Sequence, residues 1–160
     1  MKTSQNKISV AIQFTYTSSY CGGAEPPQEL LSTLATPQPF TGEKIYIKKG
    51  KINKPDDPIE AESFINENGL VKLNLPPGEY YVVFENKVDR ATYEEFVKNY
   101  GTGSAYYEPI DIKCLDTWLS TPELTFTAIA SSENSYSVNS HKNCPWNSVP
   151  CAGYIGSLPP

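Results

Sequence analysis

Long hydrophobic segments are missing from this sequence of 160 residues. No apolar run approaches the roughly 20 residues that a membrane-spanning helix needs, so we expect no membrane span. The N-terminal residues MKTSQNK contain no apolar stretch of the kind that a signal peptide has. Two interpretations follow: the chain is cytosolic, or it is a mature secreted domain whose signal peptide is absent and whose first residue is a replacement Met.

The sequence also has little positive charge. It contains 13 Lys and Arg residues against 18 Asp and Glu residues, its formal net charge is −5, and its basic residues form no stripe. Because nucleic-acid binding needs concentrated positive charge, we expect no nucleic-acid partner. Dinucleotide-binding loops, P-loops and nucleophile elbows are absent from the sequence as well. No catalytic set stands out, so we predict that the protein is not an enzyme.

Tyrosine and proline are abundant, with 11 Tyr and 14 Pro, whereas apolar residues make up 39% of the chain. Tyr favours pleated surfaces and Pro favours loops and strand edges, so this composition indicates an all-β protein with irregular connections. The pattern is clearest between residues 62 and 87. Apolar residues alternate on each side of the Pro-Pro-Gly turn at 76–78, and the Asn-Gly pair at 68–69 marks a second turn. We predict a meander of three antiparallel strands here.

The same alternation predicts further strands at residues 7–17, 43–48, 59–65, 124–130 and 136–139. Helical spacing predicts short helices at 28–34, with its leucines facing inward, and at 93–100, whereas 109–114 are expected to be extended. Seven to eight short strands predict a two-sheet antiparallel β-sandwich, transthyretin-like or immunoglobulin-like, with one or two short helices in its connections. We expect a single domain over residues 1–160. Its core would span about 7–140, and an irregular Cys- and Pro-rich tail, 141–160, would pack on one end.

Alternation also assigns side chains to faces. In the strand at 43–48 the two isoleucines face the core, so Lys44, Tyr46 and Lys48 are expected to face outward. Tyr80 and Tyr81 are adjacent, so one of the two rings is expected to face away from the core.

Four cysteines and the single histidine form the most distinctive set of residues. If the strands alternate in direction, their ends bring the cysteines and His141 to one pole of the sandwich. The favoured interpretation is two disulfides, which would pin the Cys-Gly-Gly loop and the Pro-rich tail to the sandwich. Four cysteines allow three pairings, and the sequence does not choose among them. The candidates are Cys21, Cys114, Cys144 and Cys151.

A metal site is the alternative interpretation. Thiolates of Cys21, Cys144 and Cys151, together with His141, would form a tetrahedral site for Zn or Cu. A mixed arrangement, with one disulfide and a Cys/His metal site, also fits the spacing. A catalytic thiol is disfavoured because no third group is evident that would orient His141 beside Cys144. Outside the metal hypothesis we expect no cofactor.

Aromatic residues in the predicted loops are candidates for a binding surface. Tyr106, Tyr107, Trp118 and Trp146 are expected in loops at an end of the sandwich, where binding modules contact proteins, peptides or glycans. The alternative is that Trp146, together with Tyr154, anchors the tail on the sandwich.

Residues 66–85, NENGLVKLNLPPGEYYVVFE, resemble the signature of carboxypeptidase regulatory-like and transthyretin-like domains, and GEKIYIKKG at 42–50 fits the strand that opens such domains. This resemblance implies a β-sandwich that serves as an accessory module. The chain is also similar to a group of bacterial secreted proteins of unknown function. They share a Tyr-Cys-Gly-Gly-Ala segment (here 20–24), a Cys followed by a nearby Trp (here Cys114 and Trp118), and a His-x-x-Cys-Pro-Trp…Pro-Cys…Pro-Pro tail (here 141–160). The resemblance implies secretion and names no activity.

Together these observations predict a non-enzymatic, extracytoplasmic β-sandwich in the periplasm, at the cell surface or outside the cell. We expect an envelope or secreted binding or accessory module that disulfides stabilise and that contacts a protein, a peptide or a glycan. The alternative is a metal-binding protein that uses the Cys/His cluster.

Overall fold

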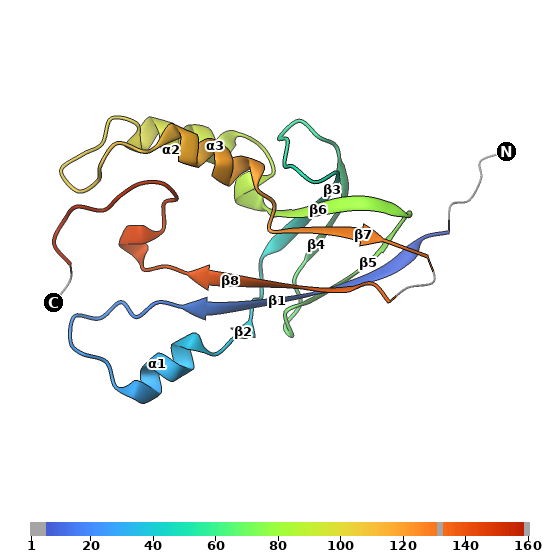
Figure 1. Ribbon diagram of the computed structural model, residues 1–160, viewed down its shortest axis with the longest axis horizontal. Helices are drawn as coiled ribbons and strands as arrows, with labels where there is room; N and C mark the ends of the chain where they lie inside the picture. Colours follow the sequence, from blue (N-terminus) through green and yellow to red (C-terminus); the bar gives the residue numbers. More distant parts are fainter. Residues whose placement is uncertain (1–5, 131–132, 159–160) are drawn as a thin grey trace.

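The computed structural model describes residues 6–130 and 133–158, and its strands form two sheets that pack face to face (Figure 1). Sheet A contains β1 (Ile8–Ser18), β2 (Gln38–Pro39), β5 (Leu70–Leu75) and β8 (Ser135–Lys142). Sheet B contains β3 (Lys44–Lys49), β4 (Ile59–Phe64), β6 (Gly78–Phe84) and β7 (Leu124–Ala128). The predicted two-sheet antiparallel β-sandwich is confirmed, with the difference that β1 and β8 pair in parallel.

Sheet A is built around β1. One edge of β1 pairs with β5 over its first half and with β2 near its end, both antiparallel. The other edge pairs with β8 in parallel, from Ala11↔Ser135 to Ser18↔Lys142. Because β1 and β8 run in the same direction, the segments that follow them emerge at the same end of the sandwich (Figure 1).

The predicted meander is wrong. β4 and β6 both pair with β3 in sheet B, whereas β5 pairs with β1 in sheet A. The chain therefore changes sheets at the turn before β5 and again at the Pro-Pro-Gly turn. Proline has no N–H to donate, so Pro76 and Pro77 end the ladder without supporting a hairpin between β5 and β6. Alternation shows which face of a strand is buried, and it does not show which sheet the strand joins.

Inward-facing side chains of both sheets fill the main core. Ile12 and Phe14 of β1 meet Ile45 and Ile47 of β3, and all four are fully buried. Tyr80 belongs to the same core and stacks on Phe126 with ring centroids 5.7 Å apart. Burial of this apolar surface is the main stabilising contribution to the sandwich.

Tyr46 and Lys48 lie on the outer face of sheet B, opposite the isoleucines, as alternation predicts, but this face is covered and not exposed to solvent. Tyr46 is buried, and Lys48 and Tyr81 are inaccessible to solvent, because the connections that follow β3 and β6 fold over this face. The Lys48 ammonium donates to the carbonyl oxygens of Lys54, Pro55 and Val88 at 3.2, 3.3 and 2.9 Å. Burial lowers the pKa of Lys48 and raises the pKa of Tyr81 to about 12.

Three α-helices in the described residues lie outside the sheets: α1 (Gln28–Ala35), α2 (Ala91–Tyr100) and α3 (Ile112–Ser120). The leucines of α1 do not face inward as predicted, since Leu30 and Leu31 are exposed and no residue of α1 is buried. Residues 112–114, predicted to be extended, form the first turn of α3, whose N-terminus is capped by the Asp111 carboxylate accepting from the Cys114 N–H at 3.1 Å. No helix in the described residues is long and apolar enough for a membrane span.

The helices α2 and α3 form a second hydrophobic core with the C-terminal segment (Figure 1). Its buried centre includes Tyr93, Ile110, Leu115 and Leu119, and Ala152 of the C-terminal segment packs against them. Tyr93 of α2 donates to the Asp116 carboxylate of α3 at 2.6 Å, and this bond raises the pKa of Tyr93. The molecule thus has a sandwich layer and a helical layer, each with its own core.

Candidate functional site: the groove between the sandwich and the helical layer

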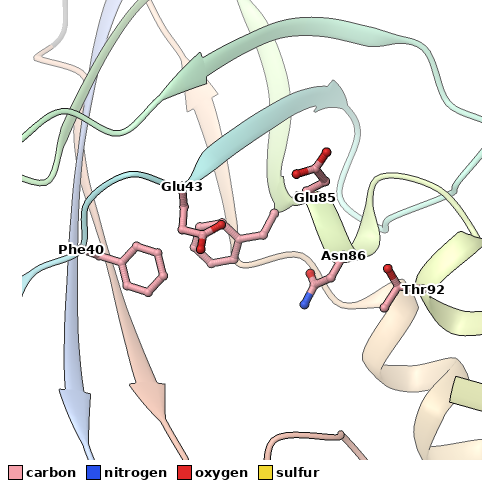
Figure 2. Close-up of a pocket in the computed structure, with 6 residues that line it drawn as sticks. Phe40, Glu43, Glu85, Asn86 and Thr92 are labelled. Carbon is pink, nitrogen blue, oxygen red and sulfur yellow. The ribbon is translucent and has the colours of Figure 1, made fainter. Parts of the chain in front are cut away.

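A groove of about 400 Å³ opens where the sandwich meets the start of the helical layer (Figure 2). One wall comes from the β2–β3 connection, and the other from the end of β6, the 3₁₀ turn η1 (Glu85–Lys87) and the first turn of α2. A volume of this size accommodates one or two side chains or a small ligand. The lining residues are Phe40, Glu43, Phe84, Glu85, Asn86 and Thr92.

Aromatic rings form the apolar part of the groove. Phe40 and Phe84 stack with centroids 5.4 Å apart, and Tyr16 of β1 meets the edge of Phe40 at 5.9 Å. The Lys142 ammonium lies 3.7 Å from the centroid of Tyr16 and 5.2 Å from that of Phe40. This row of rings therefore already holds one cation of the chain itself, next to the groove.

The polar side chains of the groove form no hydrogen bond or ion pair within the described residues. The Glu43 carboxylate extends from the β2–β3 connection into the space between Phe40 and Asn86 (Figure 2). Glu85, Asn86 and Thr92 line the opposite wall. In the part of the chain that the structure describes, neither carboxylate forms an ion pair, whereas the ion pairs present there join Lys44–Glu62, Lys49–Glu60, Lys51–Glu79 and Lys87–Glu123.

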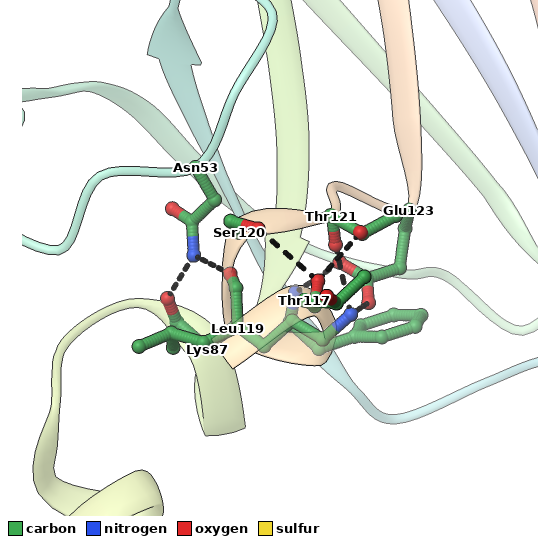
Figure 3. A network of polar contacts seen from close by, with 8 residues as sticks. Asn53, Lys87, Thr117, Leu119, Ser120, Thr121 and Glu123 are labelled. Carbon is green, nitrogen blue, oxygen red and sulfur yellow. Dashed lines mark hydrogen bonds and ion pairs between the residues drawn. The ribbon is translucent and has the colours of Figure 1, made fainter. Parts of the chain in front are cut away.

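A buried polar network fixes the wall that η1 contributes (Figure 3). Lys87 and Glu123, both almost fully buried, form an ion pair of 2.9 Å, and Lys87 also donates to the Thr121 carbonyl at 2.9 Å. The second oxygen of the Glu123 carboxylate accepts from the Phe84 N–H at 3.3 Å. This network holds β6, η1 and the segment before β7 together, directly behind the groove.

Asn53 extends the same network to the connection that follows β3 (Figure 3). Its buried side-chain amide donates to the carbonyls of Lys87 and Leu119, both at 2.8 Å. Its backbone N–H donates to the Ser120 carbonyl at 2.9 Å. The η1 turn and the end of α3 are therefore tied to sheet B through one asparagine.

Two disulfides tie the layers to the C-terminal segment. Cys21, which follows β1, bonds to Cys144, which follows β8, and Cys114 of α3 bonds to Cys151. Residues 144–151, which we call the tail strap, are thus held to the sandwich at one end and to α3 at the other. Figure 1 shows this segment running from the end of β8 toward the helical layer.

The proposed metal ligands are engaged elsewhere. The sulfurs of Cys21, Cys144 and Cys151 lie in disulfides, and a disulfide sulfur does not supply the thiolate that Zn or Cu binding requires. His141 lies beside β1, with its ring nitrogens 2.8 Å from the Thr17 hydroxyl and 2.7 Å from the Ser19 hydroxyl. Among the described residues no group of three or more His, Cys, Asp and Glu side chains is arranged to hold a metal ion.

The structure brings together three of the four aromatic candidates and separates the fourth. Tyr107 donates to the Trp146 carbonyl at 3.0 Å and meets the Tyr154 ring at 5.4 Å, while Tyr106 is 62% exposed on the same loop. Trp118 lies elsewhere, on α3, against Phe96 and under the Lys87 ammonium at 5.1 Å. Trp146 and Tyr154, the residues predicted to anchor the tail on the sandwich, contact each other at 6.5 Å and also contact Tyr107 of the α2–α3 connection.

None of the groove residues is among the candidates from the sequence. The lining residues come from three separate segments, and four of the six carry polar side chains. Single acidic residues in connections are typical of solvated surface. The signal that was available is Phe40, an aromatic residue in a Pro-rich connection and therefore outside the alternating strand pattern.

No protein-family model matches the chain, and the search of curated proteins found no match. Among solved structures the chain is similar to the shaft pilin SpaA from Lactobacillus rhamnosus GG, with 12% sequence identity and a TM-score of 0.39. The match covers 86% of this chain and 50% of the pilin chain, so the chain spans about half of that protein's length. A likeness of this size supports no statement about function.

Proposed function

We propose that the protein is a non-enzymatic, extracytoplasmic binding module whose ligand occupies the groove between the sandwich and the helical layer. The observation that carries the proposal is the groove itself, where stacked aromatic rings lie beside polar side chains that form no hydrogen bond or ion pair among the described residues. Recognition sites of proteins combine apolar contact surface with a few such polar groups. The ligand would be a protein, a peptide or a glycan.

The two disulfides support the extracytoplasmic part of the proposal. Disulfides persist in oxidising compartments, such as the periplasm, the cell surface and the extracellular space, and are rare in the cytosol. The resemblance of the Pro-Pro-Gly segment to carboxypeptidase regulatory-like domains, and of the Cys segments to a group of bacterial secreted proteins, points in the same direction. We include membership of that group in the proposal.

Binding in the groove is tested by amide chemical shifts. The ¹⁵N-labelled, disulfide-intact protein is titrated separately with a lysine-containing peptide, an uncharged Gly-Ser peptide and a short N-acetylglucosamine oligomer. We expect saturable shifts of the Asn86 and Thr92 amides with at least one of these probes. If all three leave both amides unmoved, the assignment of the groove as a binding site is rejected.

The disulfide assignment is tested by counting thiols under denaturing conditions, with and without reductant. We expect no reactive thiol before reduction and four after it, because all four cysteines are bonded. Four thiols without reduction, together with one equivalent of zinc or copper by elemental analysis, would instead support the metal hypothesis.

A further inference from the structure

We propose that the ligand of the groove is a cationic side chain, lysine or arginine, presented by a protein or peptide partner. This inference rests on the proposed function and adds the chemical class of the ligand. It follows from the charge of the groove, from the aromatic rings that line it, and from the contact of the Lys142 ammonium with the neighbouring rings of Tyr16 and Phe40.

The groove is lined by two carboxylates, those of Glu43 and Glu85. Glu85 already acts on a cation of the chain, because the pKa of Lys44 is raised first by its hydrogen bond to Glu62 and further by the charge of Glu85, whereas Glu43 forms no ion pair among the described residues. The formal net charge of −5 adds a negative field around the site. Charge complementarity of this kind steers a cationic partner toward the groove and disfavours an anionic one.

The ring surface suits the apolar stem of the same side chain. Phe40 and Phe84, stacked at 5.4 Å, give the methylene groups of a lysine or arginine an apolar surface to lie on while the charged end stays polar. An ammonium has three N–H donors, and the groove offers it the Glu43 carboxylate and further acceptors from Asn86 and Thr92. The Glu85 carboxylate points away from Glu43 and adds its negative charge beside the groove (Figure 2). The donors of the ligand and the acceptors of the groove therefore match in kind.

Lys142 provides an internal precedent for this mode of binding. Its ammonium lies over Tyr16 and Phe40, the rings that continue the row away from Phe84. The row thus holds one cation at its Tyr16 end. A second cation at the Phe84 end would be held by the same interaction with the rings and, in addition, by Glu43.

An uncharged sugar fits these groups less well. It would stack on the rings, but it would remove water from the Glu43 carboxylate without neutralising it. Burial of a charge without a partner is costly, whereas a lysine or arginine supplies that partner.

The test is the binding of a fluorescein-labelled peptide that contains two lysines between Gly and Ser residues, followed by fluorescence anisotropy. The variant Glu43→Gln/Glu85→Gln keeps the shape of the groove and removes its charge. The control variant Glu29→Gln/Glu67→Gln makes the same change of net charge at exposed positions on α1 and in the turn before β5. We expect the affinity to fall about tenfold or more in the groove variant and less than about twofold in the control.

Three results would overturn the inference. Equal losses in the two variants would mean that the peptide responds to net charge alone. Saturable shifts of the Asn86 and Thr92 amides by the neutral peptide or the sugar oligomer, without any by the lysine peptide, would reject the cationic class and leave the groove as a binding site. If no probe shifts these amides, the inference and the proposed function fail together.

Discussion

Lys87 and Glu123 form an ion pair that is buried behind the groove, with side chains only 8% and 13% exposed. A charge at such a position is tolerated because its partner and its hydrogen bonds replace water. Removing one partner leaves the other charge buried and unpaired, which costs far more than breaking an exposed ion pair. The stability of the groove wall therefore depends on a few individual side chains.

We expect Glu123→Ala to lower the free energy of unfolding by about 3–5 kcal/mol, because the Lys87 ammonium would lose its counter-charge. Urea denaturation measures the change. Glu79→Ala is the matched control, since it breaks the exposed Lys51–Glu79 pair and is expected to cost about 1 kcal/mol or less. Similar losses in the two variants would contradict the role assigned to the buried pair.

Tyr81 makes stability sensitive to alkaline pH. Its pKa is raised to about 12, first by burial, so between pH 10 and pH 12 the folded state keeps a proton that the unfolded state releases. In this window the free energy of unfolding therefore falls as the pH rises, so stability is lost. We expect Tyr81→Phe to make this fall less steep, by an amount that approaches 1.4 kcal/mol per pH unit.

The slope for Tyr81 is read from urea denaturation at several pH values. Burial lowers the pKa of Lys48, so below the pKa that Lys48 has in the unfolded state its titration makes stability rise with pH. This contribution is the same in the parent protein and in Tyr81→Phe. Tyr106→Phe, at a 62% exposed ring, is the control and should leave the slope unchanged. An unchanged slope in Tyr81→Phe would show that this phenol does not titrate as assigned.

At the scale of elements, the turn between β4 and β5 decides the topology of the sandwich. Gly69 lies in this turn with φ +75°, and its carbonyl accepts from the Phe14 N–H of β1 at 2.7 Å. A Cβ atom on Gly69 would lie 2.4 Å from the Phe14 carbonyl oxygen. The turn therefore needs glycine for its backbone conformation and for its close approach to the other sheet.

We expect Gly69→Ala to destabilise the protein by about 2 kcal/mol or more, because the φ penalty of about 1 kcal/mol is joined by the clash with β1. Gly42→Ala separates the two causes. Gly42 has φ +80° but no atom within 4 Å of its added Cβ, so only the φ penalty of about 1 kcal/mol is expected. Thermal unfolding of the two variants makes the comparison, and equal losses would show that the contact with β1 does not matter.

The elements also show what the sequence predicts and where its information ends. Alternation finds the strands and the inward faces of β1, β3 and β6, because burial on one face follows directly from the pleat. It does not find the sheet that β5 joins, since β5 buries one face in either sheet. It places Tyr46 and Lys48 on the outer face correctly, but it does not predict their burial, because nothing in the alternation records that later connections cover this face. The groove is missed because its residues come from the β2–β3 connection, the end of β6, η1 and the first turn of α2, and they meet only in the folded chain.

At the scale of the whole molecule, the sandwich layer and the helical layer are linked by the two disulfides and the tail strap. Cys21–Cys144 joins residues 123 positions apart, and Cys114–Cys151 joins residues 37 positions apart. The first bond lies at the end of the sandwich, and the second joins α3 to Cys151, which packs against the smaller core. The two disulfides therefore stabilise different parts of the molecule.

We expect replacement of either pair by alanines to lower the free energy of unfolding by about 2–5 kcal/mol, and by more for Cys21–Cys144 because it closes the longer loop. Hydrogen exchange separates their local effects. Loss of Cys114–Cys151 should speed exchange at Glu108 and Asp111, whose N–H groups bond to the C-terminal segment, and leave the amides of β1 protected. Equal acceleration in both layers would show that the two cores open as one unit.

The parallel pairing of β1 with β8 joins the earliest strand of the described chain to the latest one. A nascent chain emerging from a ribosome or a secretion channel cannot complete this pairing until more than a hundred residues have followed β1. In the meantime one edge of β1 has no partner and offers its backbone groups to any neighbouring strand. Sheet A is therefore complete only once the residues of β8 are available, and such dependence on distant contacts predicts slow acquisition of the native state and a need for protection against self-association until then.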